Sequence, residues 1–145
     1  MAGRILLVED NEDDVALTLR ALEKNRLHNA VEIVRDGQEA LDLLFRRGAY
    51  ASRTAADLPE LILLDLKVPR VDGLEVLRQI RASPITQFLP VVVLTSSSQE
   101  RDVVQSYQLG ANSYVQKPVD FDDFIEATRQ LGMYWLVLNK LPPAP

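Results

Sequence analysis

The sequence predicts an α/β fold, in which a doubly wound sheet of five parallel strands carries helices on both faces. Three observations lead to this prediction. Short apolar runs recur along the chain, amphipathic helical patterns lie between them, and helix-capping spacings begin several of these patterns. The order is therefore strand and helix repeated five times, which implies right-handed crossovers between parallel strands.

The first predicted strand and helix lie near the start of the chain. Residues 4–10, RILLVED, form a short apolar run of the kind found in central strands that are covered on both faces. In the helical pattern that follows, Val15, Leu19 and Leu22 share one face.

The second strand differs from the first, because residues 31–36, VEIVRD, alternate apolar and polar side chains. Such alternation is typical of a strand nearer the edge of a sheet. Asp36 and Glu39 then have the spacing of a capping box and predict a helix start. The apolar face of this helix is formed by Leu41, Leu44 and Phe45.

The third strand is predicted by residues 61–66, LILLDL, another run that is apolar on both faces. Asp72 and Glu75 again have capping-box spacing and predict where the next helix begins. The apolar face of that helix is formed by Leu74, Leu77 and Ile80.

The last two strands are predicted at residues 90–95, PVVVLT, and at the less apolar residues 113–118, SYVQKP. Between them, Ser97 and Glu100 have box-like spacing and predict a helix start. Gly110 follows this helical stretch, at the position where a left-handed C-cap glycine is expected.

We expect residues 1–145 to form a single domain, because a chain of 145 residues buries about 70% of its unfolded surface. Residues 46–59, a long connection rich in small residues, are expected to form a mobile surface loop before the third strand. Residues 131–145 are expected to extend the last helix, which stops at consecutive prolines.

The composition narrows the class of function. There is no apolar run of about 18 residues and no secretory signal pattern, so no membrane span is expected. The absence of cysteine excludes disulfides, thiolate zinc sites and cysteine nucleophiles. A net charge of −5 with scattered basic residues argues against binding to nucleic acid. We therefore expect a cytoplasmic protein with protein or small-ion partners.

Polar residues stand at the carboxyl end of four predicted strands. The first ends on Glu9 and Asp10, and the later ones end on Asp65, Thr95 and Lys117. Ligands of an open α/β sheet bind outside these strand ends, so all five side chains are expected at one rim. Any one of them alone could be a helix cap or a solvated loop residue, but four such endings together favour a functional site.

The residue types at this rim indicate phosphoryl chemistry. Clustered carboxylates repel one another and need a cation, and oxygen ligands on a shallow rim suit Mg²⁺. An ionised Asp65 can attack phosphorus without a general base. The metal, Lys117 and Thr95 would hold the oxygens of the transferring group.

Four segments of the chain resemble a known family. VEDN, LLDLKVPRVDG, LTS and GANSYVQKP, in this order and spacing, are similar to motifs of the receiver domain of bacterial two-component response regulators. The resemblance covers residues from about 4 to about 130. It implies a flavodoxin-like fold with strand order 2-1-3-4-5.

The resemblance also implies how phosphorylation would proceed. Asp65 would be the phosphoacceptor, receiving its phosphoryl group from the phosphohistidine of a sensor histidine kinase. Asp10, Asp65 and the backbone carbonyl of Lys67 would bind Mg²⁺ directly, while Glu9 would act largely through water. Lys117 would pair with the phosphate.

A conformational switch is implied by the same resemblance. Thr95 would be the switch hydroxyl, and Tyr114 the aromatic residue that rotates inward when Thr95 moves. Ser96 is small, as the entry of phosphate requires. The peptide bond before Pro118 is expected to be cis, so that Lys117 reaches the site.

The C-terminal segment carries more apolar residues than one core contact needs, and such a surplus often marks a partner surface. The alternative is that the segment folds back over its own sheet. The long loop and this tail are similar to those of receivers associated with bacterial phytochromes. That narrower resemblance implies a bacteriophytochrome as a candidate kinase and a homodimer formed through the last helix and its neighbours.

Three classes of function remain open from the sequence. The first is a stand-alone response regulator, which assists its own phosphorylation and dephosphorylation but is not a conventional enzyme. The second is a protein-interaction module that switches without phosphate. The third is an aspartyl-phosphate phosphatase, but such enzymes carry an acid two residues after the nucleophile, where this chain has Lys67. The Lys67 side chain could affect the dephosphorylation rate or simply extend into water.

Overall fold

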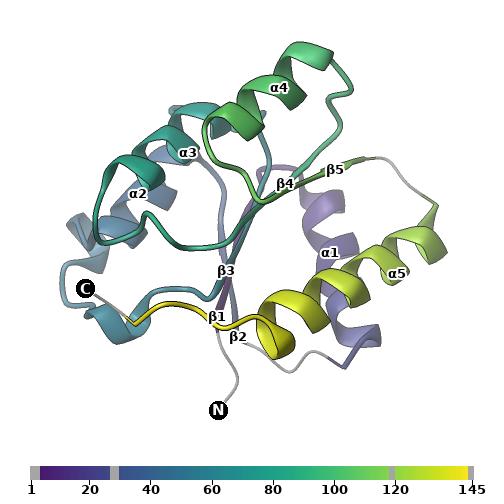
Figure 1. Ribbon diagram of the computed structural model, residues 1–145, viewed down its shortest axis with the longest axis horizontal. Coiled ribbons are helices and arrows are strands. Elements are labelled where there is room, and N and C mark those ends of the chain that lie inside the picture. Colours follow the sequence, from purple (N-terminus) through teal and green to yellow (C-terminus); the bar gives the residue numbers. More distant parts are fainter. Residues whose placement is uncertain (1–3, 27–29, 118–119, 144–145) are drawn as a thin grey trace.

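The computed structural model describes residues 4–26, 30–117 and 120–143 of the chain. Five parallel strands form one sheet in the order β2-β1-β3-β4-β5, which confirms the predicted topology. Helices α2, α3 and α4 cover one face of the sheet, and α1 and α5 cover the other (Figure 1). The strands are β1 (Arg4–Val8), β2 (Ala30–Val34), β3 (Leu61–Leu64), β4 (Val91–Thr95) and β5 (Ser113–Gln116).

The central strands are the most apolar ones because both of their faces lie under helices. β3 and β4 are buried along their whole length, and β1 is buried from Ile5 onward. The edge strands β2 and β5 are mostly half-buried, as the alternating sequence of β2 predicts. The two largest core clusters lie on opposite sides of the sheet, and both include residues of β1 and β3, so these strands are central.

Three helix starts were predicted from capping spacings, and in two of them the predicted residue is the N-cap. Asp36 and Asp72 accept hydrogen bonds from the backbone amides of Glu39 and Glu75, respectively. A helix also begins near the third predicted start, at Glu100, but its N-cap is Gln99 and not Ser97, whose hydroxyl donates to Asp102. The helices are α1 (Glu12–Lys24), α2 (Gly37–Phe45), α3 (Gly73–Ala82), α4 (Glu100–Gln108) and α5 (Phe121–Gly132).

Two further details of the helices were predicted from the sequence. Gly110 has a φ of 97°, which confirms the left-handed position after α4. In α1, however, Leu19 is 36% exposed, whereas Thr18 and Ala21 are buried beside Val15 and Leu22. The hydroxyl of Thr18 can be buried because Oγ1 donates to the carbonyl of Asp14 within the helix. Among the described residues, no helix is long and apolar enough to cross a membrane.

The segment at residues 46–59 is more ordered than the expected mobile loop. It contains two 3₁₀ turns, η1 (Gly48–Tyr50) and η2 (Ala55–Asp57). The guanidinium of Arg53 forms a two-pronged ion pair with Glu32 of β2, one N–O distance being 2.6 Å. The Tyr50 hydroxyl also donates to Glu39, at 3.1 Å. These contacts attach the segment to β2 and α2.

The C-terminal segment leaves α5 as a π-helical stretch, η3 (Met133–Leu138). Trp135 and Leu136 pack against the core on the α1 and α5 side, while Tyr134 and Leu138 remain exposed. The chain then passes beside the amino ends of the strands toward the opposite side of the sheet (Figure 1). There Leu141, Pro142 and Pro143 line a groove together with Leu58, Ile85 and Phe88.

Gly73, the first residue of α3, allows this helix to approach the end of β3 closely. Its amide donates to the carbonyl of Leu66 at 3.0 Å. A Cβ atom at Gly73 would lie 2.4 Å from the carbonyl oxygen of Asp65 and 2.6 Å from the Cα of Leu66. Contacts this short are not compatible with the observed backbone, so the position of Asp65 depends on glycine at this site.

Replacing Gly73 by Ala is therefore expected to lower the free energy of unfolding by about 1–3 kcal/mol. A loss of stability would be informative, because replacing glycine by alanine in an unobstructed helix increases stability by about 1 kcal/mol. Urea unfolding at neutral pH measures the difference. A Gly73→Ala protein as stable as the wild type, or more stable, would contradict the close packing at Asp65.

A second prediction concerns pH. The hydrogen bond from Arg53 is the main cause that lowers the pKa of Glu32 below its ordinary value of 4.5. The pair therefore stabilises the fold above pH 4.5, and this stabilisation is lost as the pH falls through the lower folded-state pKa. Glu32→Gln is expected to cost about 1 kcal/mol at pH 7 and progressively less in acid, as measured by urea unfolding over a pH series.

The matched control for Glu32→Gln is Glu12→Gln. Glu12 pairs with Arg35 at 2.5 Å, but both side chains are largely exposed. Such a pair contributes little, so the control should change stability by about 0.3 kcal/mol or less. Equal losses for the two variants, or a Glu32→Gln loss that grows in acid, would show that the Arg53 contact does not hold the segment.

Candidate functional site

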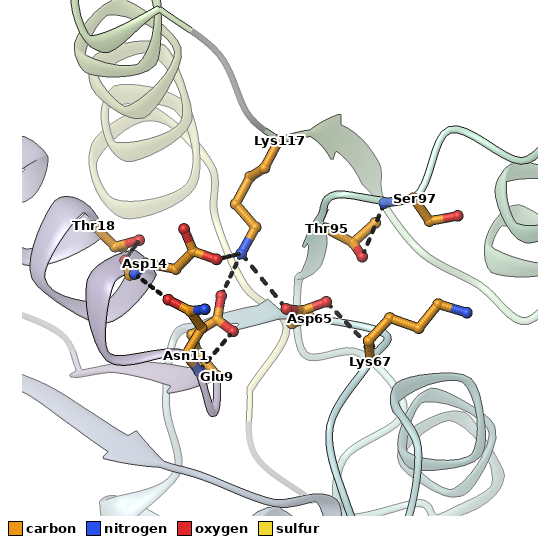
Figure 2. Close-up of polar contacts among 9 residues, drawn as sticks. All are labelled: Glu9, Asn11, Asp14, Thr18, Asp65, Lys67, Thr95, Ser97 and Lys117. Atoms are coloured by element: carbon orange, nitrogen blue, oxygen red, sulfur yellow. Dashed lines mark hydrogen bonds and ion pairs between the residues drawn. The ribbon is translucent and has the colours of Figure 1, made fainter.

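Four strand ends converge at one edge of the sheet. Glu9 follows β1, Asp65 follows β3, Thr95 ends β4 and Lys117 follows β5 (Figure 2). Backbone hydrogen bonds continue the sheet to these positions, since the amide of Asp65 donates to Val8 and that of Lys117 to Thr95. All four side chains are buried, whereas Asp10 is exposed at the same edge.

The ammonium group of Lys117 is the centre of the cluster. It contacts the carboxylates of Glu9, of Asp14 at 2.9 Å and of Asp65 at 3.5 Å. A buried lysine requires such partners, because an isolated charge in the protein interior is very costly. Burial alone would lower the pKa of Lys117, yet hydrogen bonds to Asp14 and Glu9 outweigh it and raise the pKa. The ammonium is therefore charged.

Asp14 is the residue of this cluster that the sequence prediction missed. It lies in the first turn of α1, three residues after the N-cap Asn11, whose side chain accepts from the Asp14 amide at 3.0 Å. The first turn of a helix that follows a strand end points back toward the rim of the sheet. An acidic residue at that position was the signal available in the sequence.

The carboxyl groups of Glu9 and Asp65 differ in protonation. Burial raises the pKa of Glu9 to about 7, against the opposing hydrogen bond from Lys117. Burial would also raise the pKa of Asp65, but hydrogen bonds from Glu9 and from the amide of Lys67 outweigh it and lower the pKa. Asp65 is thus ionised at neutral pH, as the sequence predicts.

Three carboxylates at this edge have the geometry of a cation site. An oxygen from each of Glu9, Asp10 and Asp65 lies within 4.8 Å of the other two. Two like charges at this distance repel by about 3 kcal/mol at an effective dielectric constant of 20. Carboxylate oxygens are the preferred ligands of hard divalent cations, so these residues fit such an ion. The Lys67 carbonyl as a further ligand stays a prediction.

The predicted switch residues lie on neighbouring strands. The hydroxyl of Thr95 is fully buried and accepts a long hydrogen bond, 3.4 Å, from the amide of Ser97. The half-buried Tyr114 packs against the core, and its hydroxyl donates to the carbonyl of Ser97 at 2.9 Å. Ser97 therefore connects the two residues. Pro118, which we expected to follow a cis peptide bond, lies outside the described residues.

Lys67 contacts the site with its backbone and leaves it with its side chain. Its amide donates to Asp65 Oδ1 at 3.1 Å. Its ammonium points away from Asp65 (Figure 2) and lies 3.8 Å from Asp102 Oδ2. The side chain is 62% exposed, so it neither enters the buried cluster nor extends freely into water.

Comparison with known proteins identifies the family. The family model of the response regulator receiver domain matches residues 5–129. The chain belongs to this family. This confirms the resemblance inferred from the four motifs and agrees with the expected extent of about 4 to 130.

Individual relatives extend over nearly the whole chain. Response regulator Rcp1 of Synechocystis is 39% identical over 140 residues, covering 97% of this chain and 93% of that protein. A structure of phosphorylated RcpA, a cyanobacterial phytochrome response regulator, has a TM-score of 0.89 at 38% identity, covering 99% and 100%. The bacteriophytochrome response regulator RtBRR has a TM-score of 0.80 at 54% identity, covering 99% and 86%.

One of these relatives is relevant to the cation site. The structure of the Mn²⁺-bound form of Rcp1 has a TM-score of 0.87 at 38% identity, with 97% of this chain and 99% of that chain covered. Together with the Glu9, Asp10 and Asp65 cluster, it indicates that this receiver domain binds a divalent cation.

Removing one carboxylate should weaken that binding. Asp10→Asn is expected to reduce affinity for Mn²⁺ by about tenfold or more, because the affinity of an oxygen-ligand site depends on its ligand charge. Asp13→Asn is the matched control, since it removes the same charge from the exposed surface of α1. Calorimetric titration measures both proteins. Equal affinities for Asp10→Asn and Asp13→Asn would place the cation elsewhere.

Proposed function

We propose that Asp65 accepts a phosphoryl group from the phosphohistidine of a sensor histidine kinase in an Mg²⁺-dependent reaction. The chain then signals through phosphorylation-dependent contacts with other proteins. The observation that carries this proposal is the placement of an ionised Asp65 between an acidic cation site and the Lys117 ammonium. Because the proposed phosphoryl donor is a sensor histidine kinase, we expect the reaction to take place in the cytoplasm.

The proposed transfer needs little from the protein besides positioning. An oxygen of Asp65 forms a bond to phosphorus while the bond from phosphorus to the histidine nitrogen breaks, and that electron pair remains on the imidazole. Asp65 needs no base, because its pKa is already lowered. The amide of Lys67 holds Asp65 Oδ1, which fixes the orientation of the carboxylate.

Lys117 and Thr95 would stabilise the transferring group. The ammonium of Lys117 already lies 3.5 Å from Asp65 Oδ2, and the buried hydroxyl of Thr95 lies at the end of the adjacent strand. Both are donors that can bind phosphoryl oxygens in a buried, weakly screened place. Glu9, Asp10 and Asp65, with the Lys67 carbonyl, would hold Mg²⁺, which neutralises charge on the phosphoryl oxygens.

The same arrangement supports the view that the chain is not a conventional enzyme. The product phosphoryl group stays on Asp65, so the protein assists only its own phosphorylation and dephosphorylation. Aspartyl-phosphate phosphatases use an acid two residues after the nucleophile, and Lys67 occupies that position. The relatives RcpA and RtBRR are named as phytochrome response regulators, which makes a phytochrome-type histidine kinase the proposed partner.

Output would pass through the residues joined by Ser97. Phosphate would draw Thr95 toward Asp65, and the position of Tyr114 would favour one of two conformations of the β4–α4 loop. Exposed apolar side chains lie on α4, which follows this loop, and on the C-terminal segment η3. They are Val104, Tyr107, Met133, Tyr134 and Leu138. We propose that these exposed side chains contact a partner protein or a second copy of the chain.

Mass spectrometry after incubation with acetyl phosphate and Mg²⁺ tests the reaction. The wild type is expected to gain the mass of one phosphoryl group, and Asp65→Asn is expected to gain none. Asp123→Asn, an exposed acidic position on α5, is the matched control and should react like the wild type. A wild type that gains no mass would favour a phosphate-independent interaction module.

Light scattering with and without beryllofluoride tests the proposed self-association. The molar mass of the protein in solution is expected to change when the phosphoryl mimic binds, because the β4–α4 loop and the surface next to it would change conformation. Leu138→Glu, at a side chain that is 70% exposed, should abolish the larger species. Leu19→Glu, on α1, is the control and should retain it. A monomer of constant mass under both conditions would contradict the dimer.

A further inference from the structure

Asp102, the third residue of α4, is a buried carboxylate that the proposed transfer does not use. Its side chain is only 6% exposed. A buried carboxylate needs hydrogen bonds or a counter-charge. Its Oδ2 accepts a hydrogen bond of 2.5 Å from the Ser97 hydroxyl and lies 3.8 Å from the Lys67 ammonium. Arg101, at 4.0 Å, is 75% exposed and adds a weaker contact.

Two of these partners, Lys67 and Ser97, connect Asp102 to the phosphoacceptor site. Lys67 binds Asp65 through its backbone amide and Asp102 through its ammonium. Ser97 binds Thr95 through its amide, accepts from the Tyr114 hydroxyl through its carbonyl and donates to Asp102 through its hydroxyl. Asp102 is therefore the shared partner of the loop after β3 and the loop after β4.

The Lys67 ammonium would have two competing anions once Asp65 is phosphorylated. In the described residues its one ion-pair partner is Asp102, and the side chain points away from Asp65 (Figure 2). A phosphoryl group would add negative charge on the Asp65 side of the same lysine. Because the pair with Asp102 is long and Lys67 is exposed, the lysine can exchange between the two anions at small cost.

We propose that Asp102 is a positioning residue that holds the Lys67 ammonium away from the phosphoryl group and thereby shortens the lifetime of phosphorylated Asp65. This inference rests on the proposed phosphorylation of Asp65. The same contact couples the phosphoryl group to the start of α4, because a lysine that moves to the phosphoryl group leaves Asp102 with only Ser97 and the exposed Arg101.

The chemistry of hydrolysis explains the direction of the effect. A water oxygen attacks phosphorus opposite the Asp65 oxygen, the bond from that oxygen to phosphorus breaks, and its electrons return to the carboxylate. Both water hydrogens leave on the phosphate, so atoms and charge balance. Attack requires an open, in-line approach to phosphorus. An ammonium paired with the phosphoryl oxygens obstructs this approach, whereas Asp102 keeps it clear.

The test compares the lifetimes of the phosphorylated wild type, Asp102→Asn, Lys67→Met and the double variant. Asp102→Asn is expected to lengthen the lifetime by about twofold to fivefold, since an ion pair with one exposed partner contributes at most about 1 kcal/mol. Lys67→Met is expected to shorten it, and the double variant should match Lys67→Met alone. Glu100→Gln, an exposed acid in the same helical turn, is the control and should match the wild type.

Two lifetime results would overturn the inference. One is an Asp102→Asn lifetime equal to that of the wild type. The other is a lengthening by Asp102→Asn that is just as large in the Lys67→Met background, because the effect would then not pass through the lysine. In either case the proteins still gain a phosphoryl group, so the proposed function stands. If the wild type gains none, the proposed function fails first and this inference fails with it.

A second measurement needs neither phosphorylation nor a change at the buried carboxylate. In unphosphorylated Lys67→Met, Asp102 loses its closer counter-charge and keeps only the weaker contact with Arg101, so amide hydrogen exchange over residues 97–103 is expected to become faster. Lys24→Met, which removes a lysine from the end of α1, is the control and should leave these amides unchanged. Exchange in Lys67→Met that equals the wild type would overturn the link between Lys67 and α4.

Discussion

The buried ammonium of Lys117, held between the carboxylates of Glu9, Asp14 and Asp65, is the interaction on which the rest of the site depends. Without this cation, acidic groups from β1, α1 and β3 would repel one another in a poorly screened place. With it, Asp65 remains ionised, although burial raises the pKa of the neighbouring Glu9 to about 7. The cluster thus keeps a reactive carboxylate available and leaves excess negative charge that favours a divalent cation.

The fold makes this arrangement possible because parallel strands end at the same edge. The parallel pairing of β1, β3 and β4 sets their register, so the residues that follow these strands lie at the same edge. Gly73 lets α3 approach the backbone at Asp65, and the amide of Lys67 orients its carboxylate. Scaffold and site are therefore coupled through main-chain contacts as well as side chains.

The sequence predicted the strands and the residues that follow them, because apolar runs and polar endings are local features. It did not predict Asp14 as a partner of Lys117 or Asp102 as a partner of Lys67, since each contact joins segments far apart in the chain. The cap predicted at Ser97 was wrong because Asp102 takes its hydroxyl, a competing partner that the spacing rule does not consider. The ordered segment at 46–59 depends on Arg53 reaching Glu32 across the fold.

A crystal structure with Mn²⁺ and beryllofluoride tests whether the cation and the phosphoryl group bind together around Asp65. We expect an anomalous peak for the metal among the oxygens of Glu9, Asp10 and Asp65, with beryllium bonded to Asp65. The fluorine atoms are expected within hydrogen-bond distance of the Lys117 ammonium and the Thr95 hydroxyl. A metal bound elsewhere, or a beryllofluoride group that Lys117 does not contact, would show that these residues do not form one phosphoryl site.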